Sequence, residues 1–296
     1  ADGFFGRSEM AHALYAEVGS SRFVAVVGAS GMGKSSLVLA GLAPLVREEG
    51  SVQIATMTPG ADPGAALQSA LSDIAVSRLD PTDRGCSLRV VAGQSSGGLL
   101  LIVDQFEECW TTTAADRREA FLAVLAECGS SRDAPSIAVV VTVRADMYDR
   151  PLSHPLLGPL VAAHTFPVTP MSPADLEAAI TLPAHRAHVD FNAGIVASMV
   201  GEVTTNPASL PLLQFTLYEL FERRVDGAIP ADAYAAVGGI GGALARHAEQ
   251  LYNEFPVDGQ ERVRAMFTRL VTPGQGIADS RRRVRHGELP AGTWET

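Results

Sequence analysis

The chain has 296 residues, about twice the length of an average domain, which predicts two or three packed units rather than one small module. Hydrophobic residues make up 47% of the sequence and charged residues 19%, which excludes intrinsic disorder as the main state, and no apolar run is long enough to span a bilayer. The formal net charge of −10 opposes binding to nucleic-acid phosphates and to anionic lipid, so neither nucleic acid nor a membrane is expected as a partner.

The first predicted elements are a strand over residues 23–27, a glycine-rich loop and a helix over residues 36–47. The loop matches G-x-x-x-x-G-K-[ST] at every fixed position. Its glycines let backbone N–H groups point into one concavity, and the helix N-terminus adds partial positive charge, so the loop predicts a polyphosphate site. Lys34 is expected to reach the β- and γ-phosphates and Ser35 to bind Mg²⁺. The residues predicted to contact the nucleotide here are Gly28, Ser30, Gly31, Met32, Gly33, Lys34, Ser35 and Ser36.

Lys34 is the one lysine among 23 lysine and arginine residues. A sequence that uses arginine at all other basic positions indicates that this position requires a compact ammonium group rather than a planar guanidinium. The composition therefore supports a phosphate-binding role for Lys34.

A strand over residues 52–57 and a helix over residues 64–78 precede an apolar strand over residues 99–103 that ends in carboxylates. This is a Walker B pattern. Asp104 is expected to hold Mg²⁺ through its water shell, and Glu107 or Glu108 to orient the attacking water.

After a helix over residues 116–128, a third apolar strand over residues 136–144 ends in Arg144. Ligands bind at the C-terminal edge of a parallel sheet, so Arg144 is a candidate sensor of the γ-phosphate, the alternative being an arginine that caps the strand into solvent. A strand over residues 164–168 is the fifth predicted strand. The alternation predicts an α/β P-loop nucleotide-binding domain with a parallel five-stranded sheet over residues 1–170.

From residue 172 the pattern is helical, beginning with a proline-containing N-cap and continuing at residues 176–182, 192–200 and 210–224. We expect a helical lid domain over residues 171–229. Helices at residues 241–255 and 261–270, followed by an arginine-rich turn at 281–285, predict a winged-helix-like domain over residues 230–296. The arginines are candidates for contact with DNA or a phosphate, or for a solvated hairpin tip that pairs with acids.

Five segments together resemble the STAND class of P-loop ATPases, which includes NACHT, AP-ATPase and MalT-type regulators, and above all the bacterial novel STAND NTPase group, often fused to WD40 repeats. They are Phe-Phe-Gly-Arg at residues 4–7, the loop at 28–35, Val-Asp-Gln-Phe-Glu-Glu at 103–108, Val-Thr-Val-Arg at 141–144 and Pro-Ala-Ser-Leu-Pro-Leu at 207–212. The sequence departs from the class at Ser8 and Met10, where glutamates are usual, and at Ser209, where glycine is usual.

The resemblance implies that the segment with Phe5, Gly6 and Arg7 lies over the adenine, that Arg144 is the sensor arginine and that Pro211 contacts the nucleotide. It also implies a switch that ADP locks closed and that ATP opens for self-association, with effector and sensor repeat domains as partners in the full-length protein. The ligands would be ATP or ADP with Mg²⁺, turned over slowly. Arg282 and Arg283 of the third domain are further candidates for nucleotide contact.

Two other functions fit parts of the pattern. A DNA-binding initiator or loader ATPase of the AAA+ type also joins an ATPase core, a helical lid and a winged helix, but the charge of −10 opposes it. A nucleotide-binding scaffold without catalysis would follow if Glu107 and Glu108 pointed away from the γ-phosphate. A GTPase is disfavoured because no N-K-x-D segment is present.

The sequence begins Ala-Asp-Gly, without the basic and apolar regions of an export signal, and its three cysteines show no C-x-x-C spacing. These features are typical of a reducing compartment. We therefore expect a cytoplasmic protein whose chain is a piece of a longer one.

Overall fold

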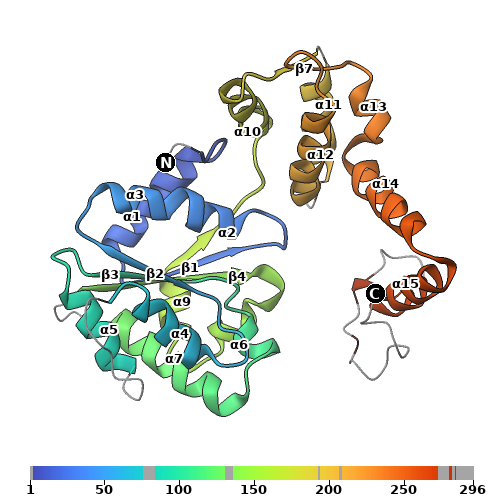
Figure 1. Ribbon diagram of the computed structural model, residues 1–296. Coiled ribbons are helices and arrows are strands. Elements are labelled where there is room, and N and C mark those ends of the chain that lie inside the picture. Colours follow the sequence, from blue (N-terminus) through green and yellow to red (C-terminus); the bar gives the residue numbers. More distant parts are fainter. Residues whose placement is uncertain are drawn as a thin grey trace.

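The computed structural model describes residues 3–75, 84–130, 136–192, 194–206, 209–272, 280–281 and 284. Within this part of the chain, five strands form one sheet in the order β2-β3-β4-β1-β5. All four neighbouring pairs are parallel, which confirms the predicted α/β sheet (Figure 1). The strands are β1 (Phe23–Gly28), β2 (Gln53–Met57), β3 (Leu99–Val103), β4 (Ile137–Arg144) and β5 (Thr165–Pro167).

Helices cover both faces of the sheet, which explains why β1, β3 and β4 are apolar at successive positions. Phe23 and Ala25 of β1 belong to one hydrophobic core, and Val24 and Val26 belong to the other. The second face carries α1 (Ser8–Ser20) and the helix after the loop, which runs through α2 (Lys34–Ser36), a π-helical stretch (Leu37–Leu42) and α3 (Ala43–Glu48). The first face carries α4 (Pro63–Ser72), α5 (Arg84–Gly93), α7 (Ala115–Ser130) and α9 (Gly158–Ala163).

Short helices follow the strands that carry predicted site residues. They are α6 (Glu108–Thr111) after β3, and a 3-10 turn (Ala145–Met147) with α8 (Asp149–Leu152) after β4. These turns fix the backbone just beyond the C-terminal edge of the sheet.

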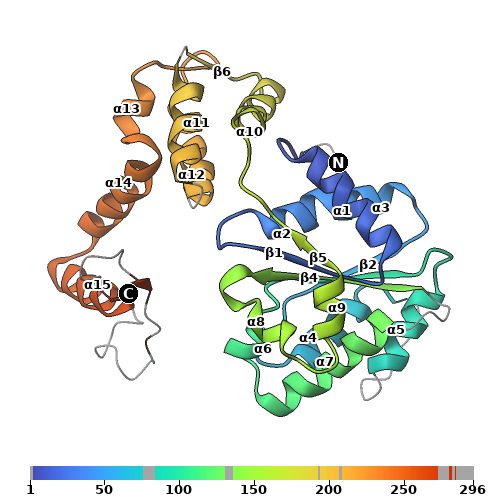
Figure 2. The same cartoon turned by 180° about the vertical axis from the view of Figure 1, so that it is seen from behind.

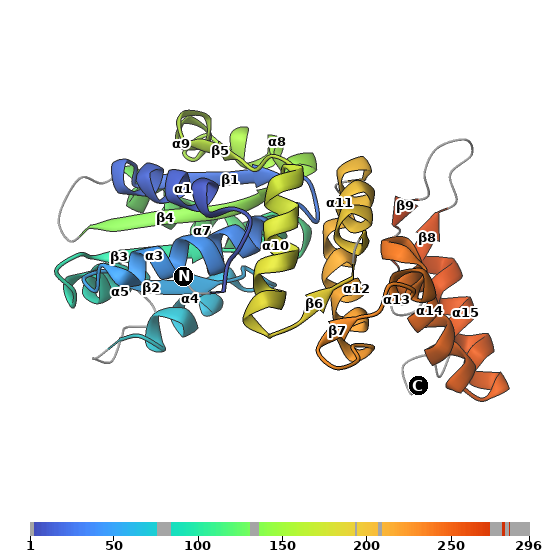
Figure 3. The same cartoon turned by 90° about the horizontal axis from the view of Figure 1, so that it is seen from above.

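The chain leaves β5 and enters α10 (Pro173–Arg186), where Ser172 and Asp175 form a complete capping box. In Figure 3, α10 is the helix of the C-terminal group that lies nearest the sheet, and Figure 2 shows the connection from behind. The group continues with β6 (Asp190–Phe191), α11 (Ile195–Thr205), α12 (Leu210–Glu222), β7 (Ala228–Ile229), α13 (Ala233–Val237), α14 (Gly239–Glu254), α15 (Val257–Leu270), β8 (Val271–Thr272) and β9 (Ser280–Arg281).

A third hydrophobic core joins α10 to α14 and runs from Leu176 to Ala243. It includes Ile229, Ala233 and Val237, so the packing continues across the boundary expected between residues 229 and 230. In the described part of the chain, α13 and the first turns of α14 pack with α10–α12.

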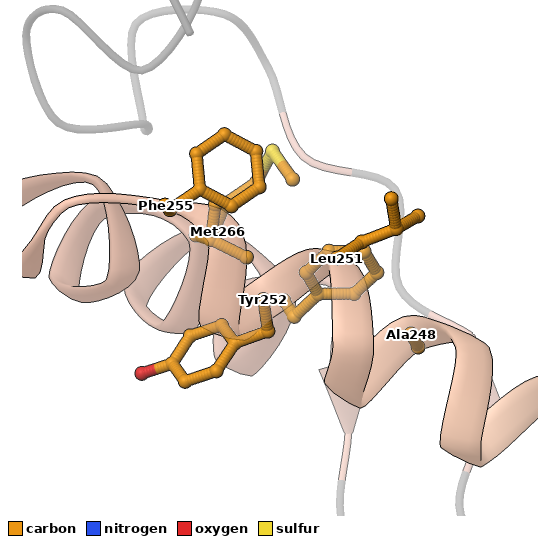
Figure 4. A pocket seen from close by; sticks show the side chains of 7 residues that line it. Ala248, Leu251, Tyr252, Phe255 and Met266 are labelled. Carbon is orange, nitrogen blue, oxygen red and sulfur yellow. The ribbon is translucent and has the colours of Figure 1, made fainter.

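The helices α14 and α15 enclose an apolar hollow of about 280 Å³ (Figure 4). Leu251 and Phe267 on its rim are 46% and 58% exposed. Its lining residues are Ala248, Leu251, Tyr252, Phe255, Val263, Met266 and Phe267. Among the described residues, no helix combines the length and apolarity that a bilayer crossing requires.

Candidate functional site

The glycine-rich loop joins the end of β1 to α2. Gly31 and Gly33 have φ angles of 79° and 78°, a left-handed conformation that residues with a side chain rarely adopt. The ammonium of Lys34 donates hydrogen bonds of 2.9 Å to the carbonyls of both Gly28 and Ala29. Burial lowers the pKa of Lys34 from its ordinary value, and the carboxylate of Glu107 opposes that shift. The lysine therefore lies within its own loop, beside the N-terminus of the helix.

Asp104, directly after β3, accepts two hydrogen bonds on one carboxylate oxygen. Ser35 Oγ donates to Oδ1 over 2.8 Å, and Thr142 Oγ1 of β4 donates to the same atom over 2.6 Å. Thr142 also accepts from the backbone N–H of Gln105 over 2.9 Å. The loop serine and the strand-end aspartate are thus brought together, and Thr142, which sequence reasoning did not assign, orients the aspartate.

The two glutamates after β3 differ in their partners. Glu108 Oε2 accepts from the backbone N–H of Gly60 over 3.0 Å, and Thr113 Oγ1 donates to the Gly60 carbonyl over 2.7 Å. Glu107 Oε2 is buried and has no hydrogen-bond partner in the part of the chain that the structure describes. Glu107 also has the largest charge interaction with Lys34. Glu108 is engaged in fixing a loop, whereas Glu107 is available beside the lysine.

Arg144, the last residue of β4, pairs in register with Gly28, where the loop begins. Its guanidinium binds Asp146 through two hydrogen bonds, Nε to Oδ1 over 3.0 Å and Nη2 to Oδ2 over 2.6 Å. Because of this pairing, the pKa of Asp146 lies below its usual value and that of Arg144 above it. Arg144 is therefore held by a protein carboxylate at the same sheet edge as the loop.

The segment before α1 lies between the loop and α10. Arg7 is 6% exposed and donates from Nη1 to the carbonyl of Met32 over 2.6 Å and from Nη2 to that of Thr169 over 2.8 Å. Burial lowers its pKa, an effect that the nearby Asp175 carboxylate opposes. The Arg186 guanidinium lies 5.5 Å from the centre of the Phe5 ring. This segment thus links the phosphate loop to the start of the C-terminal helices.

A cavity of about 180 Å³ lies between the loop and the C-terminal helices. Leu210 of α12 comes close to the loop, since a Cβ atom added at Gly33 would lie 3.7 Å from its Cδ2. Sequence reasoning missed the contribution of α10 and α11, because no local pattern marks residues that meet only through packing. The cavity is lined by Arg7, Met32, Pro170, Met171, Leu176, Val203, Thr204 and Leu210.

The other predicted site residues take different positions. Ser30 and Ser36 are exposed on the loop and on the first turn of the helix, and Pro211 is exposed at the start of α12. Arg282 and Arg283, together with Pro207 and Ala208, lie outside the described residues.

A phosphate loop after β1, an inner strand of a parallel sheet, with an aspartate at the end of β3, defines a nucleotide-binding P-loop NTPase. The family model of Novel STAND NTPase 1 matches residues 1–296. The chain belongs to this family, which confirms the resemblance found in the sequence. No curated protein matches the sequence.

Solved structures with a similar fold include a Walker-type ATPase of Pyrococcus abyssi, with a TM-score of 0.56 and 16% identity over 84% of this chain and 73% of that one. The ORC2 protein of Aeropyrum pernix in its ADP form has a TM-score of 0.57 and 17% identity over 84% of this chain and 69% of that one. Cdc6p of Pyrobaculum aerophilum has a TM-score of 0.51 and 15% identity over 79% of this chain and 63% of that one. At these identities the likeness shows the fold alone.

Proposed function

We propose that this chain binds ATP and ADP with Mg²⁺, hydrolyses ATP slowly and acts as the switch module of a STAND-type signalling or defence regulator. The proposal rests on three features around one glycine-rich loop: Lys34, the Ser35–Asp104 hydrogen bond, and the buried Oε2 of Glu107, which has no hydrogen-bond partner among the described residues. Nucleotide binding follows from the loop, and hydrolysis from the carboxylates.

The donor set at the loop suits Mg²⁺, a hard cation that prefers oxygen ligands and keeps several waters. Ser35 Oγ and Asp104 Oδ1 lie 2.8 Å apart, so one ion with its water shell can engage both residues. The bound ion would neutralise phosphate charge. Thr142 keeps the Asp104 carboxylate turned toward the serine.

Glu107 is the water-orienting residue in this proposal, and Glu108 is structural. A buried carboxylate oxygen without a partner is costly, and a role in binding a ligand or water explains its retention. Its charge interaction with Lys34 indicates that it lies near the phosphate end of the site. The same observation disfavours a scaffold that binds nucleotide without catalysis.

The nucleotide base fits the cavity between the loop and the C-terminal helices. Its lining is mostly apolar, with Arg7 and Thr204 as polar members, which suits a flat heteroaromatic ring. Phe5 and Gly6 belong to the segment beside it, and Leu210 and Pro211 begin the helix that comes near Gly33. One nucleotide would therefore contact both the sheet domain and the helices.

The proposed switch has a sheet domain at residues 1–170, a helical lid at 171–229 and a winged-helix-like domain at 230–296. The continuous core through α13 and α14 argues for a lid that extends past residue 229. The antiparallel β8–β9 pair after α15 is compatible with a wing. The proposal includes self-association on activation, with effector and sensor repeat domains as partners, and family membership supports this part of it.

An initiator or loader ATPase that binds DNA is the second candidate, because ORC2 and Cdc6p share the fold. The net charge of −10 opposes it. A titration with duplex DNA at several salt concentrations distinguishes the two candidate functions, since a switch module is expected to show no specific binding to DNA.

Calorimetry of ATP and ADP binding to the protein freed of nucleotide tests the proposal. Lys34→Ala is expected to abolish binding, and Lys34→Arg to weaken it strongly despite its charge, because a planar guanidinium cannot replace the compact ammonium that bonds two loop carbonyls. Unchanged nucleotide affinity in Lys34→Ala would contradict the assignment.

A further inference from the structure

The carboxylate of Asp146 has no role in the site as described so far, although it holds the residue proposed to sense the γ-phosphate. Arg144 lies beside Gly28 in the β1–β4 register, and the 3-10 turn that follows β4 brings Asp146 back against its guanidinium. Both oxygens of Asp146 accept from it, at 3.0 and 2.6 Å. Two parallel bonds fix the plane of the guanidinium as well as its distance.

The bonds to Asp146 occupy only one edge of the guanidinium. A guanidinium carries five N–H donors, and Asp146 engages the Nε–Nη2 edge. In the described part of the chain, Nη1 has no hydrogen-bond partner. The arginine side chain is 26% exposed, whereas that of Asp146 is 61% exposed. The carboxylate therefore approaches from the solvent side and leaves a donor edge of the arginine free.

Arg144 lies in the charge environment of the phosphate loop. Lys34 and Glu107 both interact electrostatically with Arg144. An ion pair as exposed as this one contributes little to folding stability, so stability alone does not account for a bidentate geometry built two residues after the strand end.

We propose that Asp146 is a positioning residue: it clamps the Nε–Nη2 edge of Arg144 so that Nη1 is presented to the γ-phosphate, and it thereby sets how strongly the site prefers ATP to ADP. This inference rests on the proposed function, because it takes the loop as the nucleotide site. Without the clamp, Arg144 keeps its charge but loses its fixed orientation, and contact with the γ-phosphate has a higher entropic cost.

The test compares the affinities for ADP and for an ATP analogue with a nitrogen bridge between the β- and γ-phosphates, both measured with Mg²⁺. Arg144→Ala is expected to reduce analogue affinity about tenfold or more, the loss of one charge-assisted hydrogen bond, and to leave ADP affinity unchanged. Asp146→Asn is expected to reduce analogue affinity about three- to fivefold, again without effect on ADP. The double variant is expected to match Arg144→Ala, because Asp146 acts only through the arginine.

Asp149→Asn is the matched control, since this nearby carboxylate makes one exposed ion pair of 3.7 Å with Arg150 and is expected to change neither affinity. Higher analogue affinity in Asp146→Asn would overturn the proposal, because it would mean that the Asp146 carboxylate keeps Arg144 away from the γ-phosphate. Equal losses for ADP and analogue, or additive effects in the double variant, would also overturn it. Failure of the proposed function has a different signature, namely that Lys34→Ala still binds both nucleotides.

Discussion

Two adjacent glutamates with the same chemistry have different surroundings in this site. The Glu108 carboxylate satisfies the backbone N–H of Gly60, a residue with a positive φ of 59° that needs support from its neighbours. The Glu107 carboxylate has a buried oxygen that finds no hydrogen-bond partner in the described ranges of the chain. Hydrogen bonding, rather than position in the motif, separates the loop-fixing acid from the acid proposed to orient water.

We predict that Glu107→Gln slows ATP turnover about a hundredfold or more while ATP stays bound, because the amide cannot accept a proton from water. Glu108→Gln is the matched control and is expected to keep turnover within about threefold, since an amide oxygen can still accept from Gly60. Single-turnover hydrolysis and ATP affinity measure both effects. Normal turnover in Glu107→Gln with slow turnover in Glu108→Gln would reverse the assignment.

Among the elements, the segment before α1 connects the phosphate loop with α10. Gly6 has a φ of 80°, and a Cβ atom there would lie 2.3 Å from the carbonyl oxygen of Asp175 and 2.9 Å from the Cβ of Ala179. Arg7 then donates to the carbonyls of Met32, in the phosphate loop, and Thr169, in the connection from β5 to α10. Only glycine allows the backbone to pass so close to α10 that the arginine can reach both carbonyls.

We predict that Gly6→Ala lowers the unfolding free energy by about 1–3 kcal/mol, from backbone strain and from the close contact with α10. It is also expected to weaken ADP binding, because α10 must move away from the loop. Gly19→Ala is the control: nothing lies within 4 Å of its Cβ position inside α1, where alanine favours the helix. Urea unfolding and ADP affinity measure the two effects, and equal behaviour of both variants would contradict the argument.

For the whole molecule, the described contacts between the sheet domain and the C-terminal helices are concentrated around the proposed nucleotide site. The cavity beside the loop is lined from both sides, by Arg7 and Met32 on one and by Leu176, Val203 and Leu210 on the other. A ligand in it shifts the equilibrium between closed and open arrangements only by its difference in affinity for them. Two charge-assisted contacts across the junction would bias that equilibrium about a hundredfold or more.

Small-angle scattering is therefore expected to give a smaller radius of gyration with ADP than after the nucleotide is stripped. Release of ADP is expected to be slow, because the helices must move before the nucleotide leaves. Arg7→Ala removes both carbonyl contacts. It is expected to bring the radius of gyration of the ADP-bound protein closer to that of the nucleotide-free protein. An unchanged radius in all three samples would mean that the nucleotide does not hold the domains together.

Local sequence determined the elements that carry the chemistry. The apolar runs before Gly28 and Asp104 predicted buried strands, and the capping residues Ser172 and Asp175 predicted the start of α10, because these features depend on neighbours within a few residues. The resemblance to the STAND class rested on short motifs of this kind, and the family model matches residues 1–296.

Tertiary structure alone decided the strand order, the π-helical stretch after the loop, the hydrogen-bond partners of Arg7 and Arg144, and the burial of Glu107 Oε2. It also showed that the third hydrophobic core continues past residue 229, where the helical lid was expected to end. The physical reason is that strand and cap signals are local, whereas a tertiary contact such as the hydrogen bond between Arg7 and Thr169 joins residues 162 positions apart. Such contacts depend on how whole elements pack, which no local pattern records.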